Sequence, residues 1–120
     1  MREKDIESKL RNEIKKLGGI AYKFTSPGNN GVPDRIVLLP GGVIKFVELK
    51  RPGGKTSKIQ DMQIARIQKL GFDVRVIDNM DELDYFISEV KFLSEMLSSG
   101  SDIEWYSNRI TISDIALRKP

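Results

Sequence analysis

Residues 31–50 read GVPDRIVLLPGGVIKFVELK, and this stretch decides the fold of the chain. Two runs rich in Val, Ile, Leu and Phe, 35–39 and 43–49, indicate strands because such residues favour extended backbone. The Pro-Gly-Gly between them predicts a short hairpin loop in which glycine adopts positive φ angles. Both runs are almost continuously apolar, so we expect a sheet that is covered on both faces.

The hairpin is predicted to bring two carboxylates together. A three-residue loop places Leu39 opposite Val43, and counting back along both strands places Asp34 opposite Glu48. Directly opposed residues project on the same face, about 5 Å apart at Cβ. Lys50 shares that face because strand side chains alternate. A shift of register by one residue would remove this arrangement, so the prediction depends on the turn.

Two carboxylates and one amine arranged in this way suit phosphodiester hydrolysis. Asp34 and Glu48 offer oxygen ligands to a hard divalent cation, and Lys50 places a cation beside the attacking water. The backbone carbonyl of Leu49 is a further candidate ligand. The alternative interpretation is a pair of charged strand ends joined by a salt bridge, because short motifs also occur by chance.

Composition limits the chemistry that such a site can perform. The 120 residues include neither Cys nor His, which excludes thiolate and imidazole zinc sites, disulfides and Ser-His-Asp triads. Any metal must be held by oxygen, which indicates Mg²⁺ or Mn²⁺. No apolar run or leader predicts a membrane span or export. We therefore expect a soluble protein of the cytoplasm, that of the host cell if the chain is viral.

Charge is distributed unevenly along the chain. Residues 1–77 carry 16 Lys or Arg and 8 Asp or Glu, a balance of +8, whereas residues 78–120 carry 4 and 9, a balance of −5. The basic part contains the candidate site, and its field suits a polyanion such as nucleic acid. A solvated surface without such a partner would also explain this distribution.

Hydrophobic periodicity predicts the other elements. The order is α-β-β-β-α-β-α, which indicates an α/β domain with a mixed sheet flanked by helices. Asn79 and Glu82 fit the N-cap and N3 positions of the last helix, whose apolar stripe contains Leu83, Phe86, Ile87, Val90 and Leu97. Outside the hairpin we predict helices over 5–17, 57–70 and 79–97 and strands over 20–25 and 72–77.

The chain is predicted to divide near residue 98. Residues 1–97 form the folded domain, and residues 98–120 form a Ser-rich linker and a C-terminal extension. The alternating stretch 109–113 suggests that the extension adds a strand, covers a sheet edge or contacts another subunit.

Two more residues are candidates for the site. Glu7 borders the apolar stripe of the first helix and is able to turn toward a metal, but an exposed Glu near a helix N-terminus is equally expected. Gln60 lies three residues after Ser57, which fits a capping box. Its amide is also placed to contact the water, a phosphate or Lys50, and both interpretations remain open.

Basic residues around the motif are candidates for contacts to DNA phosphates. Such contacts position a substrate without reading its sequence. A solvated basic loop is the alternative. The candidates are Lys23, Arg35, Arg51, Lys55 and Lys58.

Taken together, these motifs resemble the VRR-NUC family, the virus-type replication-repair nuclease branch of the PD-(D/E)xK superfamily. The resemblance spans roughly residues 3–90 by element order. The matching residues are Glu7, Gly31-Val32-Pro33-Asp34, Val47-Glu48-Leu49-Lys50, Ser57-x-x-Gln60, Leu70-Gly71, Leu83 and Phe86-Ile87.

The resemblance implies a restriction-endonuclease-like fold and a metal-dependent DNA endonuclease that selects branched DNA such as a Holliday junction. Small members of this kind are typical of bacteriophages and resemble homodimeric enzymes. By position, Asp34, Glu48 and Glu7 would form the acidic cluster, Lys50 would orient or activate the water, and Gln60 would support the site. The alternatives are a non-catalytic DNA-binding module on the same fold and an oligomeric structural protein.

Overall fold

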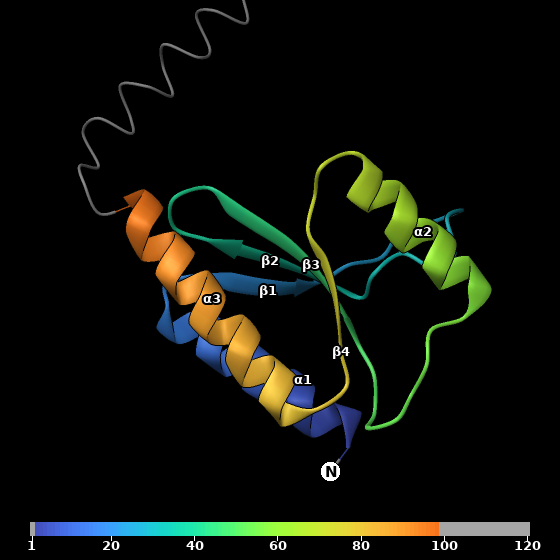
Figure 1. Ribbon diagram of the computed structural model, residues 1–120, viewed down its shortest axis with the longest axis horizontal. Coiled ribbons are helices and arrows are strands. Elements are labelled where there is room, and N and C mark those ends of the chain that lie inside the picture. The colour runs from blue at the N-terminus through green and yellow to red at the C-terminus, as the bar shows by residue number, and fades with distance from the viewer. Residues whose placement is uncertain (1, 99–120) are drawn as a thin grey trace, which may run out of the picture.

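The structure, a computed structural model, describes residues 2–98. Its element order is the predicted α-β-β-β-α-β-α, a mixed α/β arrangement (Figure 1). The elements are α1 (Glu3–Lys16), β1 (Ile20–Lys23), β2 (Arg35–Leu39), β3 (Val43–Leu49), α2 (Lys58–Lys69), β4 (Val74–Ile77) and α3 (Met80–Ser98).

Four strands form one sheet in the order β1-β2-β3-β4. The first three are antiparallel, and β4 runs parallel to β3. Leu39 pairs with Val43 and Arg35 with Val47, which confirms the predicted hairpin register. The loop closes over three residues because Gly41 and Gly42 adopt φ angles of 89° and 77°, a region that glycine enters without strain.

The apolar core lies on one face of the sheet. Helices α1 and α3 pack side by side on this face, as Figure 1 shows. Alternate residues of β2 and β3, such as Val37 and Val47, point toward them because strand side chains alternate. The helices contribute Ile6, Leu10 and Ile14 from α1, and Leu83, Phe86 and Val90 from α3.

Helices flank the sheet as predicted, but the opposite face is covered over only part of its extent. Only α2 lies on this side among residues 2–98, over the end of the sheet near β4 (Figure 1). Tyr22 and Ile44 on the same face remain 57% and 42% exposed. Continuous apolar character therefore marked strands correctly but did not report how much of each face is buried.

Two details of the helices differ from the prediction. Helix α1 begins at Glu3 rather than residue 5, because the Arg2 N–H donates to the Asp5 carboxylate at 3.0 Å and the helix is capped earlier. In α3, Leu97 is 47% exposed and Ser94 is buried instead. The Ser94 hydroxyl donates to the Pro40 carbonyl at 2.7 Å, which ties α3 to the hairpin loop.

The N-cap of α3 is confirmed, because the Asn79 side chain accepts the Glu82 N–H at 2.8 Å. None of the described helices is long and apolar enough to cross a membrane. The predicted roles of the C-terminal extension concern residues 99–120, which lie outside the described part of the chain.

Candidate functional site

Asp34 and Glu48 meet where the hairpin strands end. The Asp34 N–H donates to Glu48 Oε1 at 3.2 Å, and the Leu49 N–H donates to both Asp34 carboxylate oxygens at 3.3 and 3.4 Å. The two carboxylates are therefore cross-linked through the backbone of β2 and β3. The turn-based register predicted this meeting, and the structure places both residues as that register requires.

Glu48 is held by three groups that come from different segments. Its side chain is only 6% exposed. Oε1 accepts the Asp34 N–H, while Oε2 accepts the Gln60 amide at 3.2 Å and lies 3.3 Å from Lys50 Nζ. A buried carboxylate requires such partners. The contacts fix the direction in which its remaining lone pairs point.

Gln60 completes the predicted capping box, and its amide contacts Glu48 rather than Lys50. Its Oε1 accepts the Ser57 N–H at 2.9 Å, and its own N–H donates to Ser57 Oγ at 3.2 Å, which completes the capping box of α2. Because Oε1 is used by the cap, the amide nitrogen faces Glu48. One side chain thus joins the start of α2 to the carboxylate pair.

The environment of Asp34 disfavours a second negative charge. Burial and the neighbouring Glu48 carboxylate raise the pKa of Asp34 to about 7, and Glu3 adds to this effect. The hydrogen bond from the Leu49 N–H and the positive charge of Arg35 act in the opposite direction but do not compensate. Two carboxylates that repel each other at neutral pH are a typical setting for a bound cation.

Glu7 is placed apart from this pair. Its carboxylate lies 2.7 Å from the Arg35 guanidinium, and Arg11 is 4.0 Å away on the same helix. Arg35 also donates to the Ala21 carbonyl at 3.4 Å. Among residues 2–98, no three acidic side chains gather closely enough to hold a metal ion. The assignment of Glu7 as a ligand therefore remains a prediction that the geometry does not favour.

Sequence reasoning missed Glu3 and the contact that Gly31 makes near the site. Glu3, on the first turn of α1, is the acidic residue of that helix whose charge reaches Asp34. Gly31, in the loop before Asp34, lies against the backbone of α2 at Ile59. Gln63 on α2 donates to the Asn30 carbonyl of the same loop. The Gly in the GVPD motif was visible in the sequence, but its contact depends on the position of α2.

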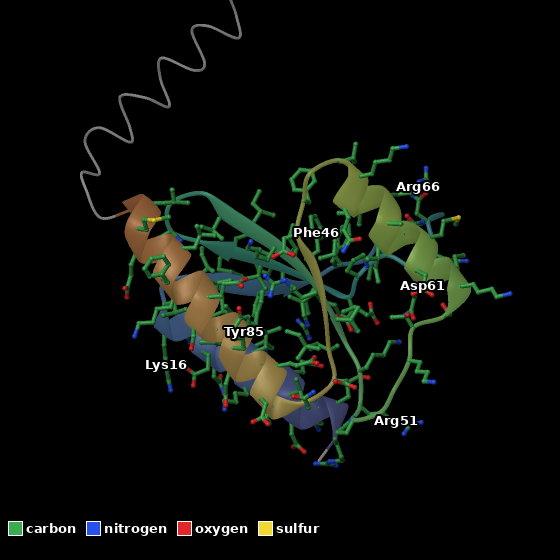
Figure 2. The ribbon with its side chains drawn as sticks, viewed as in Figure 1. Lys16, Phe46, Arg51, Asp61, Arg66 and Tyr85 are labelled. Atoms are coloured by element: carbon green, nitrogen blue, oxygen red, sulfur yellow. The ribbon has the colours of Figure 1, made fainter. Side chains whose placement is uncertain are left out.

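Most of the predicted DNA-contacting residues are exposed around the site. Arg51 and Lys55 lie in the connection between β3 and α2, where Figure 2 shows Arg51. Lys58 is exposed at the start of α2, and Lys23 at the end of β1. Arg35 differs because its side chain is only 11% exposed and is engaged by Glu7.

The donor set suits a hard divalent cation. Asp34 and Glu48 supply carboxylate oxygens, the ligands that such ions prefer. The N–H and C=O of one strand residue project toward the same neighbouring strand. Because the Leu49 N–H meets Asp34, its carbonyl is directed to the same side. Lys50 is the nearest cation to Glu48 recorded among residues 2–98, at 3.3 Å.

Comparisons with known proteins agree with this geometry. The VRR-NUC domain model matches residues 3–81. A protein named "Putative nuclease p44", from Acyrthosiphon pisum secondary endosymbiont phage 1, is 53% identical over 81 residues, which cover 68% of this chain and 87% of that protein.

A solved structure described as a VRR_NUC domain superposes with a TM-score of 0.68 at 32% identity, and the match covers 72% of this chain and 94% of that one. Sequence and fold therefore agree on one family. The chain belongs to the VRR-NUC domain family.

Proposed function

We propose that this protein is a DNA endonuclease that uses Mg²⁺ or Mn²⁺ to hydrolyse phosphodiester bonds, with a preference for branched DNA such as a Holliday junction. The observation that carries the proposal is the arrangement of Glu48. Its two oxygens are fixed by the Asp34 backbone N–H, the Gln60 amide and the Lys50 amine, so donors from three segments converge on one carboxylate.

Asp34, Glu48 and the Leu49 carbonyl would hold the metal. The raised pKa of Asp34 supports this assignment, because a divalent cation would offset the repulsion between the two carboxylates. When bound, the metal supplies Lewis acidity and a more acidic water. Of the α1 carboxylates, Glu3 lies within electrostatic range of Asp34, whereas Glu7 is occupied by Arg35.

Lys50 is proposed to stabilise the charge that develops on the phosphate. Its Nζ is fixed 3.3 Å from Glu48 Oε2, and its side chain is 19% exposed, so it is positioned without being closed off from a substrate. A cation that is already oriented requires no reorganisation during the reaction. The exposed Arg51, Lys55 and Lys58 would hold the flanking phosphates.

The same proposal includes a homodimer that acts in the cytoplasm of a host cell. A twofold-symmetric pair of sites matches the symmetry of a four-way junction, so that two strands are cut by one assembly. The homodimer proposal rests on the family resemblance and on the exposed basic residues around the site. Sedimentation of the purified protein with and without a junction tests it.

The main test is cleavage by purified protein across junction, flap, splayed and linear duplex substrates in Mg²⁺, in Mn²⁺ and in EDTA. We expect metal-dependent cutting that is fastest on a branched substrate. Asp34→Ala and Lys50→Ala should abolish it. Asp81→Ala and Lys69→Ala, which remove charges of the same type from exposed positions on α3 and α2, should not.

Folded protein that cuts none of these substrates would contradict the proposal. If it still binds DNA tightly in EDTA, the non-catalytic DNA-binding module becomes the better description. Full cleavage by Asp34→Ala would show that the reaction occurs elsewhere.

A further inference from the structure

Helix α2 carries Gln60 to the site, yet none of its side chains is buried. Helices in globular proteins are usually held by an apolar face that packs on the core. Helix α1 follows this rule, and α2 does not. Its apolar side chains Ile64 and Ile67 are only half-buried. Polar and backbone contacts therefore have a larger share in fixing the position of α2 relative to Glu48.

One contact is the close approach of Gly31 to the first turn of α2. Gly31 has a φ of +88°, and a Cβ at this position would lie 2.8 Å from the Ile59 carbonyl oxygen and 3.1 Å from the Gln60 nitrogen. The loop backbone thus passes against α2 where no side chain fits. Gly28 has a similar φ of +81°, but a Cβ there would meet nothing within 4 Å.

The second contact is made by Gln63. Its amide nitrogen donates to the Asn30 carbonyl at 3.1 Å. Gln63 lies three residues after Gln60, so both amides project from neighbouring positions on one face of the helix. One amide reaches the loop and the other reaches Glu48, so a shift of α2 along the loop would displace both.

We propose that Gly31 and Gln63 are positioning residues that dock α2 on the loop before Asp34 and thereby aim the Gln60 amide at Glu48. Only two residues, Val32 and Pro33, separate Gly31 from Asp34, and Pro33 is buried. The segment that receives α2 therefore also holds the partner carboxylate. The inference rests on the proposed function, because it treats Glu48 as the ligand that Gln60 orients.

Paired glycine variants separate docking from backbone strain. Gly31→Ala and Gly28→Ala both force alanine into positive φ, so both should lower the melting temperature, and Gly31→Ala should lower it further because its Cβ also meets the Ile59 backbone. Only Gly31→Ala also pushes α2 away from the loop. We expect it to lower kcat and Mn²⁺ affinity by about 10-fold or more, as for other groups that orient metal ligands. Equal losses of kcat and Mn²⁺ affinity in Gly31→Ala and Gly28→Ala would overturn the proposal.

Variants of Gln63 test the second contact without backbone strain. Gln63→Met removes the donor to Asn30, whereas Gln63→Lys keeps one. We expect Gln63→Met to lower kcat and Mn²⁺ affinity about 10-fold with little change in KM for DNA, and Gln63→Lys to recover most of both. Gln68→Met, on an exposed part of the same helix, is the control. Wild-type kcat and Mn²⁺ affinity in Gln63→Met would overturn the proposal.

A readout without cleavage keeps this inference separate from the proposed function. The side-chain NH₂ resonances of Gln60 in metal-free protein report its hydrogen bond to Glu48. Gln63→Met should move them toward those of a free glutamine, and Gln68→Met should leave them in place. Unmoved Gln60 resonances in Gln63→Met would overturn the inference. Inactive wild-type protein would contradict only the nuclease proposal.

Discussion

Helices α1 and α2 flank the same sheet but are held by different forces. The α1 side chains Ile6, Leu10 and Ile14 have no exposed area and are packed into the core. Helix α2 has no fully buried side chain: Ile64 and Ile67 are half-buried, and Gln60 and Gln63 add polar contacts to the domain. Burial of apolar area supplies most of the stability of a domain. The α1 side therefore stabilises the fold, while the α2 side orients the site.

The charged groups follow the same division. On the core side, Asp73 is paired with Lys45 at 3.0 Å and with Arg75 at 2.9 Å. On the site side, Asp34 and Glu48 repel each other, and Lys50 is paired with Glu48. Stability is commonly given up where function requires like charges to lie together. Matched substitutions should therefore lower mainly stability on the core side and mainly the cleavage rate on the site side.

The largest difference is expected between Lys45 of β3 and Lys50, which directly follows that strand. Lys50 and Lys45 are similarly buried, with side chains 19% and 15% exposed, and each is paired with a carboxylate. Lys50→Met should lower the DNA cleavage rate by about 10³-fold, because a preorganised cation at the reacting phosphate is lost. Lys45→Met should cost stability and leave the rate near that of wild type. Comparable rates in the two variants would remove Lys50 from the reaction.

A matched isoleucine pair tests the stability side of the comparison. Ile14 on α1 is fully buried, and Ile59 on α2 is 42% exposed. Ile14→Ala should lower the free energy of unfolding by about 3 kcal/mol through lost burial and a cavity. Ile59→Ala should cost less than about 1 kcal/mol. Urea denaturation measures both values, and equal losses would mean that α2 contributes to the core after all.

The sequence predicted the parts of this arrangement that depend on local rules. The turn at residues 40–42 and the alternation of strand side chains determined the hairpin register, so the meeting of Asp34 and Glu48 followed from counting. Ser57 and Gln60 were predicted as a capping box because that motif is local. Neither inference required knowledge of how the helices pack.

The parts that could not be predicted depend on contacts between distant segments. Periodicity gave the buried stripe of α1 but not which acidic residue beside it faces Asp34. Glu7 was chosen, and the structure pairs it with Arg35 while the charge of Glu3 reaches Asp34. The role of Gly31 depends on α2, which lies 27 or more residues further along the chain.

Two aspartates should give opposite dependences of stability on pH in the metal-free protein. The pKa of Asp34 is raised to about 7, so its contribution to stability is present below its unfolded pKa and is lost as pH rises through about 7. For Asp73, burial alone would raise the pKa, but hydrogen bonds from Arg75 and Lys45 outweigh burial and lower it. Its contribution is present above the unfolded pKa and is lost in acid.

Melting curves between pH 3 and pH 9 check this contrast. At about pH 8, Asp34→Asn should raise the free energy of unfolding by on the order of 1 kcal/mol, and Asp73→Asn should lower it by a similar amount. Added Mg²⁺ should stabilise wild type but not Asp34→Asn. A stabilising effect of Asp73→Asn, or a destabilising effect of Asp34→Asn at pH 8, would contradict the division between the two sides.

The last comparison is the most selective, because it sets the N-caps of two helices against each other. Ser57 caps α2 by accepting the Gln60 N–H, and Asn79 caps α3 by accepting the Glu82 N–H. Ser57→Ala and Asn79→Ala should each cost about 1 kcal/mol of stability. Loss of the Ser57 hydroxyl also loosens Gln60, so that variant alone should lower the cleavage rate, by about 10-fold.

Ser57→Thr retains a capping hydroxyl and should restore most of the cleavage rate, as measured at saturating Mg²⁺ on the best substrate of the panel. If Asn79→Ala slowed cleavage as much as Ser57→Ala, the loss would follow from weaker folding in general. If only Ser57→Ala slowed cleavage, the Ser57 cap would act mainly by orienting Gln60 toward Glu48 rather than by stabilising the helix. Of the two helices, only α2 connects its cap to that carboxylate, through the two ends of one glutamine amide.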